Sequence, residues 1–229
     1  MKLNYYFILG IMLFLAHFGS TSTYAQQATQ KFLLKIPELP NGNTCQTNDD
    51  IIVKWNDKIL ALKNEMTVLL SDEKQQMEQA QANAKPRMDM FEPANAEKIQ
   101  KLGEEIQAIE TKANAITSEI VSSYIEEKGN ILIKYAGKTE SSQGKLEECR
   151  ELSLVRKNYL TTYKKRLDEL IALGVKGNGL SDEMTRMSYS GYAFRTQYGF
   201  WMGFLIGYLD ELSHFYDDLP TYQTEGYER

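Results

Sequence analysis

Apolar residues recur at alternating intervals of three and four along most of this chain of 229 residues. Such spacing keeps one face of an α-helix apolar, whereas a half-buried β-strand needs an interval of two. Short polar stretches divide the pattern into four segments. The sequence therefore predicts an all-α fold, an elongated up-down-up-down four-helix bundle with coiled-coil-like packing, in one domain over residues 49–219.

The first two predicted helices are joined by a turn between Pro86 and Pro93. Asn48 or Asp49 suits the N-cap of the first helix. Beyond Ser71 its apolar stripe ends, so we expect that end of the helix to project past the core. The two stripes are, in the first helix, Ile52, Trp55, Ile59, Leu62, Met66 and Leu69 and, in the second, Ile99, Leu102, Ile106, Ile109, Ala113, Ile116 and Ile120.

The second helix changes register near its end. Gly129 and Asn130 indicate a kink or an early stop there. A short strand over residues 131–135 is the alternative to continued helix, although no partner strand is evident.

The last two predicted helices are separated by a glycine-rich turn at 174–179. The third helix begins with Ser141 or Ser142 as its cap and ends at Gly174. The fourth begins with the cap Ser181 and extends to Leu219. We expect the charged residues of the third helix to form ordinary solvated pairs: Arg150, Arg156, Lys157, Lys164, Lys165 and Arg166 with Glu147, Glu148, Glu151, Asp168 and Glu169.

Gly199, Gly203 and Gly207 recur every four residues in the fourth helix, roughly opposite its apolar stripe of Phe194, Tyr198, Trp201, Leu205, Tyr208 and Leu212. Three interior glycines cost a helix about 3 kcal/mol relative to alanine, so we expect another element to approach this face closely. Our interpretation is a neighbouring helix of the bundle, with Gly203 packed at the centre. The alternatives are a docked partner helix and a membrane contact through the glycine and aromatic helix 194–215.

A second candidate interaction surface lies in the turn between the first two helices. It contains Met88, Met90 and Phe91, three large apolar side chains in an otherwise polar segment. Methionine packs adaptably on varied protein surfaces. The alternative is that these side chains fold back onto the helices.

Residues 1–25 have the features of a secretory signal peptide: Lys2, an apolar run at 7–18, and small or polar residues up to Ala25. An uncleaved membrane anchor is the alternative, although the run is shorter than the roughly 20 residues that span a bilayer. We expect an exported protein, periplasmic or extracellular. Residues 26–48 form a predicted extended segment, and residues 220–229 a flexible tail.

The chain that is predicted to remain after export is acidic. Removal of residues 1–25 takes away Lys2 and no acidic residue, so 25 basic and 31 acidic residues leave a net charge of −6. An acidic balance argues against non-specific nucleic-acid binding. Cys45 and Cys149 are the two cysteines, and in an oxidising compartment we expect them to form a disulfide, with two buried free thiols as the alternative.

Motifs for catalysis are few. Glu211 and His214 have the Glu-x-x-His spacing of carboxylate-bridged di-metal bundles, but such sites need two pairs, and His214 is the one histidine after residue 25. The glycines at 137 and 174–179 lack the spacing of a phosphate loop. We therefore expect no catalytic residue, metal or cofactor.

The sequence thus favours a non-catalytic scaffold or adaptor of the cell envelope that acts through protein contacts. The candidate interaction residues are Met88, Met90, Phe91, Gly199, Gly203 and Gly207. We expect the partner to be a protein, either a different chain or, by self-association through the helices, a second copy of this one. The alternatives are a membrane-associated subunit that docks through helix 194–215 and a metal-binding or enzymatic bundle centred on His214.

Overall fold

The computed structural model describes residues 32–41, 44–192, 199–217 and 219. Its helices are α2 (Asp49–Asn83), α3 (Pro93–Tyr135), α4 (Ser142–Ser188) and α5 (Gly199–Ser213). Shorter elements are η1 (Thr44–Gln46), β1 (Lys85–Pro86), η2 (Met88–Phe91) and β2 (Tyr189–Ser190). The predicted all-α bundle is confirmed. The predicted signal peptide and the tail at 220–229 lie outside the described residues.

Capping side chains lie at the starts of two helices, near the predicted positions. The Asn48 side chain accepts a hydrogen bond from the Ile51 amide at the start of α2, at 3.1 Å. At the start of α4 the Ser141 hydroxyl accepts from the Gly144 amide, at 3.0 Å. Each bond satisfies an amide that has no partner within its own helix. Pro93 begins α3, where its missing N–H costs nothing.

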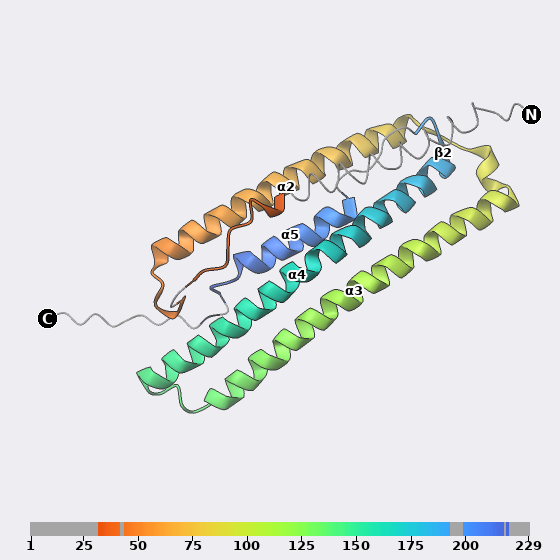
Figure 1. Ribbon diagram of the computed structural model, residues 1–229. Coiled ribbons are helices and arrows are strands. Elements are labelled where there is room, and N and C mark those ends of the chain that lie inside the picture. The colour runs from red at the N-terminus through yellow and green to blue at the C-terminus, as the bar shows by residue number, and fades with distance from the viewer. Residues whose placement is uncertain (1–31, 42–43, 193–198, 218, 220–229) are drawn as a thin grey trace, which may run out of the picture.

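The helices alternate in direction, and α5 is much shorter than the others (Figure 1). The main helix contacts pair α3 with α4, α4 with α5, and α5 with α2. In Figure 1, α5 accordingly lies between α2 and α4 over part of their length. The deepest part of the core is therefore centred on α5. Its fully buried side chains include Ile59, Met66, Leu160, Leu167, Trp201, Leu205, Leu209 and Phe215.

A disulfide joins Cys45 of η1 to Cys149 of α4, with the two Cα atoms 5.9 Å apart. Both cysteines are buried. The adjacent hydroxyls of Thr44 and Ser153 are hydrogen-bonded to each other. The predicted pairing is therefore present, and it fixes the segment before α2 to the first turns of α4.

The predicted boundary between the third and fourth helices is wrong. Residues 174–179 are helical, and α4 continues to Ser188, so neither Gly174 nor Ser181 is a cap. Gly174 is required by a contact between helices and not by a helix end. A Cβ atom at this position would lie 2.5 Å from the Cα of Trp201. This glycine lets the first turn of α5 lie against α4. Phe194 and Tyr198, which were assigned to the fourth helix, lie outside the described residues.

Asn178 of α4 provides a cap for the neighbouring helix. Its Oδ1 atom accepts a hydrogen bond from the Phe200 amide, at 2.7 Å, in the first turn of α5. A Cβ atom on Gly199 would lie 2.8 Å from the same oxygen. Glycine at 199 therefore leaves room for a cap that comes from another element.

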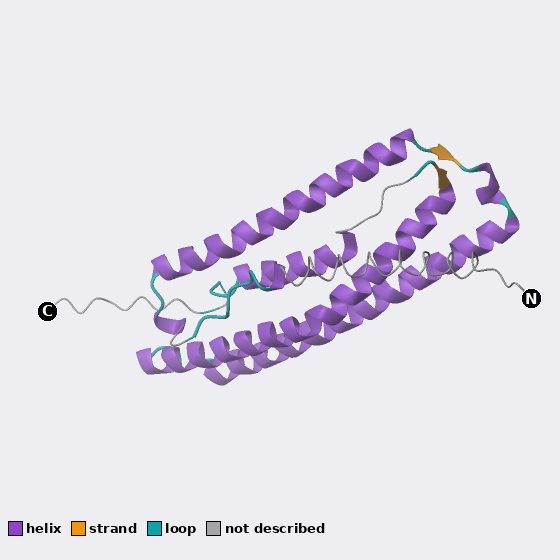
Figure 2. Cartoon of the chain, turned by 45° about the horizontal axis from the view of Figure 1, so that its top comes forward, coloured by secondary structure: helices purple, strands orange, loops and turns teal. Residues whose placement is uncertain are grey.

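The far ends of α2 and α4 are joined by a two-stranded antiparallel sheet. Lys85 of β1 pairs with Ser190 of β2, and Pro86 with Tyr189. Figure 2 shows these two strands together at the end of the molecule where α2 and α4 both finish. The end of α2 was expected to project from the core, but it is tied to the end of α4.

The remaining chain differs from expectation in two places. Helix α3 continues through Gly129 to Tyr135, with Ile131 and Tyr135 buried, so the strand alternative for 131–135 is wrong. Residues 32–36 form a helical turn in the segment that was expected to be extended. Phe32 and Ile36 of this turn are buried in the core.

Candidate functional site

The turn between α2 and α3 contains two strongly exposed apolar side chains. Met88 is 86% exposed and Phe91 is 72% exposed, whereas Met90 is partly buried. Met88 and Phe91 therefore do not fold back onto the helices. We use the name tip for residues 85–92 together with 188–190.

Hydrogen bonds fix the backbone of the tip. The Arg87 amide donates to the carbonyl of Ser188, at 3.1 Å, and the Ser190 hydroxyl donates to the carbonyl of Lys85, also at 3.1 Å. The Asn95 amide group donates to the carbonyl of Asp89, at 2.7 Å. Two exposed apolar side chains are thus held on an ordered support.

A local ion pair also lies within the tip. Arg87 donates to both carboxylate oxygens of Asp89. This hydrogen bonding lowers the pKa of Asp89 and raises the pKa of Arg87. Both groups are therefore charged over the physiological pH range, and the pair adds no net charge to the tip.

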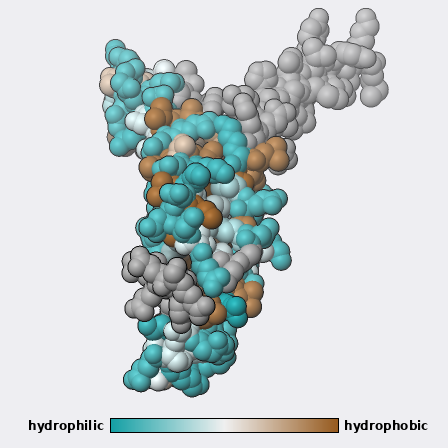
Figure 3. Space-filling model, turned by 90° about the vertical axis from the view of Figure 1, so that its left-hand side faces the viewer, coloured by the Kyte–Doolittle hydropathy of each residue, from teal (hydrophilic) through white to brown (hydrophobic). Residues whose placement is uncertain are grey.

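The opposite end of the molecule has a different surface. Figure 3 views that end and shows hydrophobic residues as separate patches among hydrophilic ones. Exposed apolar side chains also occur along the long helices: Ile51, Val53, Leu60 and Val68 of α2, Val121, Ile125, Leu132 and Ile133 of α3, and Leu154 of α4. Single exposed apolar residues of this kind are ordinary on protein surfaces.

The three glycines of α5 are not packed together against one neighbouring element of the described chain. A Cβ atom on Gly207 would be 3.5 Å from the Tyr163 hydroxyl, while one on Gly203 would meet no described atom within 4 Å. Gly203 is exposed. The expectation that Gly203 packs at the centre of a glycine face is therefore wrong. The opposite stripe is buried as predicted at Trp201, Leu205, Tyr208 and Leu212.

His214 lies on the surface. Its Nδ1 atom is 2.8 Å from Asp217 Oδ2, and both side chains are more than half exposed. Within the described ranges, no group of three or more His, Cys, Asp and Glu side chains is arranged to hold a metal ion. In the same ranges, no helix combines the length and the apolar character needed to cross a bilayer.

Arg156 was expected among solvated surface charges, and this is wrong. Its side chain is 2% exposed. The guanidinium donates from Nη1 to Glu211 Oε2, at 3.0 Å, and from Nη2 to the Glu211 carbonyl, at 2.6 Å. Glu211 of the Glu-x-x-His motif therefore ties α5 to α4.

Tyrosine rings surround this guanidinium. Its central carbon lies 5.3 Å from the ring centre of Tyr124 and 5.1 Å from that of Tyr159. The two rings stack, with centres 4.5 Å apart. Burial and the Glu211 carboxylate raise the pKa of Tyr159, so the phenol stays neutral. A signal was available in the sequence, because Arg156 stands three or four residues from Leu152, Tyr159 and Leu160 on the buried face of α4.

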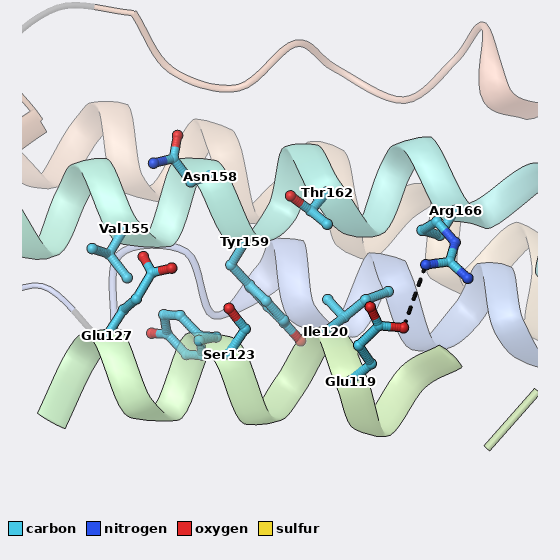
Figure 4. Close-up of a pocket in the computed structure, with 10 residues that line it drawn as sticks. Glu119, Ile120, Ser123, Glu127, Val155, Asn158, Tyr159, Thr162 and Arg166 are labelled. Atoms are coloured by element: carbon cyan, nitrogen blue, oxygen red, sulfur yellow. Dashed lines mark ion pairs between the residues drawn. The ribbon is translucent and has the colours of Figure 1, made fainter. Parts of the chain in front are cut away.

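A shallow groove lies beside this cluster, between α3 and α4, with a volume of about 160 Å³. Its lining from α3 is Glu119, Ile120, Ser123, Tyr124 and Glu127, and its lining from α4 is Val155, Asn158, Tyr159, Thr162 and Arg166. Figure 4 shows Tyr159 reaching from α4 towards α3, and Arg166 paired with Glu119 at one end. No sequence pattern predicts this groove, because its residues come from two helices and match no motif.

Near the tip, the interior of the bundle is polar. Glu73, Asn178 and Asp182 are each more than 90% buried. Asp182 is paired with Arg186. Polar side chains are therefore buried at this end, whereas the fully buried side chains around α5 are mainly apolar.

No protein-family model, curated protein or solved structure matches the chain. The proposed function therefore rests on the geometry of the tip.

Proposed function

We propose that this protein is an exported, non-catalytic scaffold or adaptor that contacts another protein through its tip. The observation that carries the proposal is the pair of exposed side chains, Met88 and Phe91, on a hydrogen-bonded support. Large apolar residues near the centre of a protein contact contribute most of its affinity, and methionine and phenylalanine are enriched there. A fixed backbone reduces the entropy that is lost on binding.

The shape of the chain supports the same proposal. The tip lies at one end of three long helices, away from the core around α5 (Figure 1). A contact surface at that position can reach a partner without exposing the core. The disulfide accords with an oxidising compartment, where export by residues 1–25 would deliver the chain.

Site-specific photo-crosslinking tests this function. A photoreactive amino acid at position 88 is expected to give one discrete adduct in the native cell envelope. Ile133 is the matched control, because it is also an exposed apolar residue, 76% accessible, at the other end of α3. The adduct from position 88 should be lost when Phe91→Ser is added.

Two results would contradict the proposal. One is the same adduct from positions 88 and 133, since a contact along the whole bundle would not depend on the tip. The other is the absence of any adduct from position 88 in a folded, exported protein.

A further inference from the structure

Met88 differs from the other methionines of the described ranges in its exposure. It is 86% exposed, whereas Met66 and Met202 are fully buried. The other methionines in these ranges are partly buried: Met77, Met90, Met184 and Met187. A dissolved oxidant must reach the thioether sulfur before it can oxidise a methionine. Met88 is therefore the methionine that such an oxidant reaches most readily.

Met88 also lies within the surface that is proposed to contact a partner. Met88 and Phe91 are the first and last residues of η2, three positions apart. In a 3-10 helix, residues three apart project from the same side. The two exposed side chains therefore form one apolar surface, and a chemical change at the sulfur alters that surface directly.

The backbone of the tip does not depend on the Met88 side chain. The Glu92 amide donates to the carbonyl of Asp89, at 3.1 Å, and the Asn95 side chain donates to the same carbonyl, at 2.7 Å. The Arg87 amide donates to the carbonyl of Ser188. In the described part of the chain, no hydrogen bond of the tip involves the Met88 sulfur. A change at this sulfur can therefore alter the contact surface while the fold stays intact.

We propose that Met88 is a reversible oxidation site that switches off the protein contact of the tip, with a peroxide as the oxidant. This inference rests on the function proposed above. The sulfur lone pair attacks one peroxide oxygen, so that an S–O bond forms and the O–O bond breaks. The thioether is oxidised to a sulfoxide, and hydrogen peroxide is reduced by two electrons to water.

The sulfoxide opposes the contact because it is polar. Oxidation of this kind converts an apolar side chain into a polar one and disrupts interfaces that use methionine. A polar group that enters an apolar interface loses its hydrogen bonds to water. Because Met88 is exposed, its sulfoxide is also accessible to a reductase, so the change is reversible.

Peptide mapping by mass spectrometry tests the site itself. The full chain, with its disulfide intact, is treated with hydrogen peroxide. Met88 is expected to become a sulfoxide at least about tenfold faster than Met66 and Met202, which are shielded in the core. Circular dichroism should show an unchanged fold when Met88 is oxidised, and methionine sulfoxide reductases of both stereochemical classes should restore the thioether.

Photo-crosslinking in the native cell envelope tests the switch. A photoreactive amino acid replaces Glu92, which is exposed and directly follows η2, so that Met88 is retained. Peroxide should reduce the adduct at least about tenfold, and reduction of the sulfoxide should restore it. Met88→Leu is the matched control, because leucine is apolar, similar in volume and without an oxidisable sulfur. Its adduct should persist in peroxide.

Three outcomes would overturn the switch alone. They are oxidation of Met88 no faster than that of the buried methionines, an undiminished adduct from chains whose Met88 is oxidised, and an equal loss of adduct in Met88→Leu. The absence of any adduct before peroxide is added would instead contradict the proposed protein contact, and this inference with it. The two failures are therefore distinguishable.

Discussion

The bundle has two ends of different construction. At the core end, α5 lies against α2 and α4, and its side chains Trp201, Leu205 and Leu209 are fully buried. At the tip end, which comprises residues 70–108 and 175–192, the buried side chains are Glu73, Leu102, Asn178, Asp182 and Tyr192. Most of these carry a polar group. Apolar burial dominates the stability of folded proteins, so the core end is expected to hold the fold while the tip end is available for contact.

The largest expected effect comes from removing the disulfide at the core end. Cys45→Ala/Cys149→Ala opens a loop with a sequence separation of 104 residues. Closing a loop of this length is worth up to about 4.7 kcal/mol on the chain-entropy model, and we expect a loss of about 4 kcal/mol. Urea denaturation of the oxidised wild type and the variant measures it. An unchanged midpoint would mean that the disulfide does not stabilise the core end.

The second effect concerns Arg156. Arg156→Ala removes the donors to Glu211 and leaves a void beside Tyr124 and Tyr159. Breaking a buried pair costs roughly 3–5 kcal/mol, and the partial exposure of Glu211 favours the lower limit, about 3 kcal/mol. Arg150→Ala is the control, because Arg150 is exposed on the same helix. Equal unfolding free energies for the two variants would contradict the assignment of Arg156 to the core.

The third prediction compares two glycines at the core end. Gly174→Ala places a methyl group against the backbone of Trp201 and should cost about 1–3 kcal/mol. Gly203→Ala meets no described atom and should stabilise α5 by up to about 1 kcal/mol. Thermal midpoints of both variants are the measurement. A loss of stability in Gly203→Ala would restore the original expectation of a packed glycine face.

The fourth prediction is the pH dependence of the contact between α2 and α5. The hydrogen bond from Lys63 lowers the pKa of Asp210. The contribution of a lowered carboxyl pKa is fully present above the unfolded value of about 3.9 and is lost as the pH falls through the folded value. Lys63→Met should therefore be less stable than wild type near neutral pH, by less than about 1 kcal/mol because the pair is partly exposed.

Denaturation between about pH 2 and pH 7 measures that difference. It should shrink towards zero as the solution is acidified. A difference that is constant over the whole range would show that Lys63 acts through packing and not through the charge of Asp210.

The smallest effect is expected at the tip. Met88→Ser/Phe91→Ser changes two exposed side chains and should alter the unfolding free energy by less than about 0.5 kcal/mol. Leu102→Ser, a buried position at the same end, is the control that should destabilise the protein. A large loss of unfolding free energy in the double variant would show that the tip also stabilises the fold. The two ends would then not differ in their contribution to stability.

Much of the fold could be predicted because it depends on local pattern. Apolar residues at intervals of three and four predicted the buried positions Ile59, Met66 and Ile116. Capping side chains predicted the starts of α2 and α4. Pairing of Cys45 with Cys149 followed from the cysteine content, since an exported chain with two cysteines meets an oxidising compartment. Each of these inferences needed only near neighbours or the composition of the chain.

The errors share a different cause. Gly174 was predicted to end the third helix, but it lies inside α4, where the close approach of the Trp201 backbone leaves no room for a Cβ atom. Arg156 was predicted to be solvated, because its contacts with Tyr124 and Glu211 come from other helices. The groove likewise needs α3 and α4 in register. Long-range contacts of this kind leave no local pattern in the sequence.

The ties at the two ends of α2 have a mechanical consequence. At one end the disulfide of η1 connects the chain to α4, and at the other end β1 pairs with β2 at the end of α4. The two helices therefore form a closed frame, and a pull on the tip is shared by both helices along their length. Peeling α2 away would require either the strand pair or the covalent bond to open first, so force received at the tip is transmitted to the core end of the bundle.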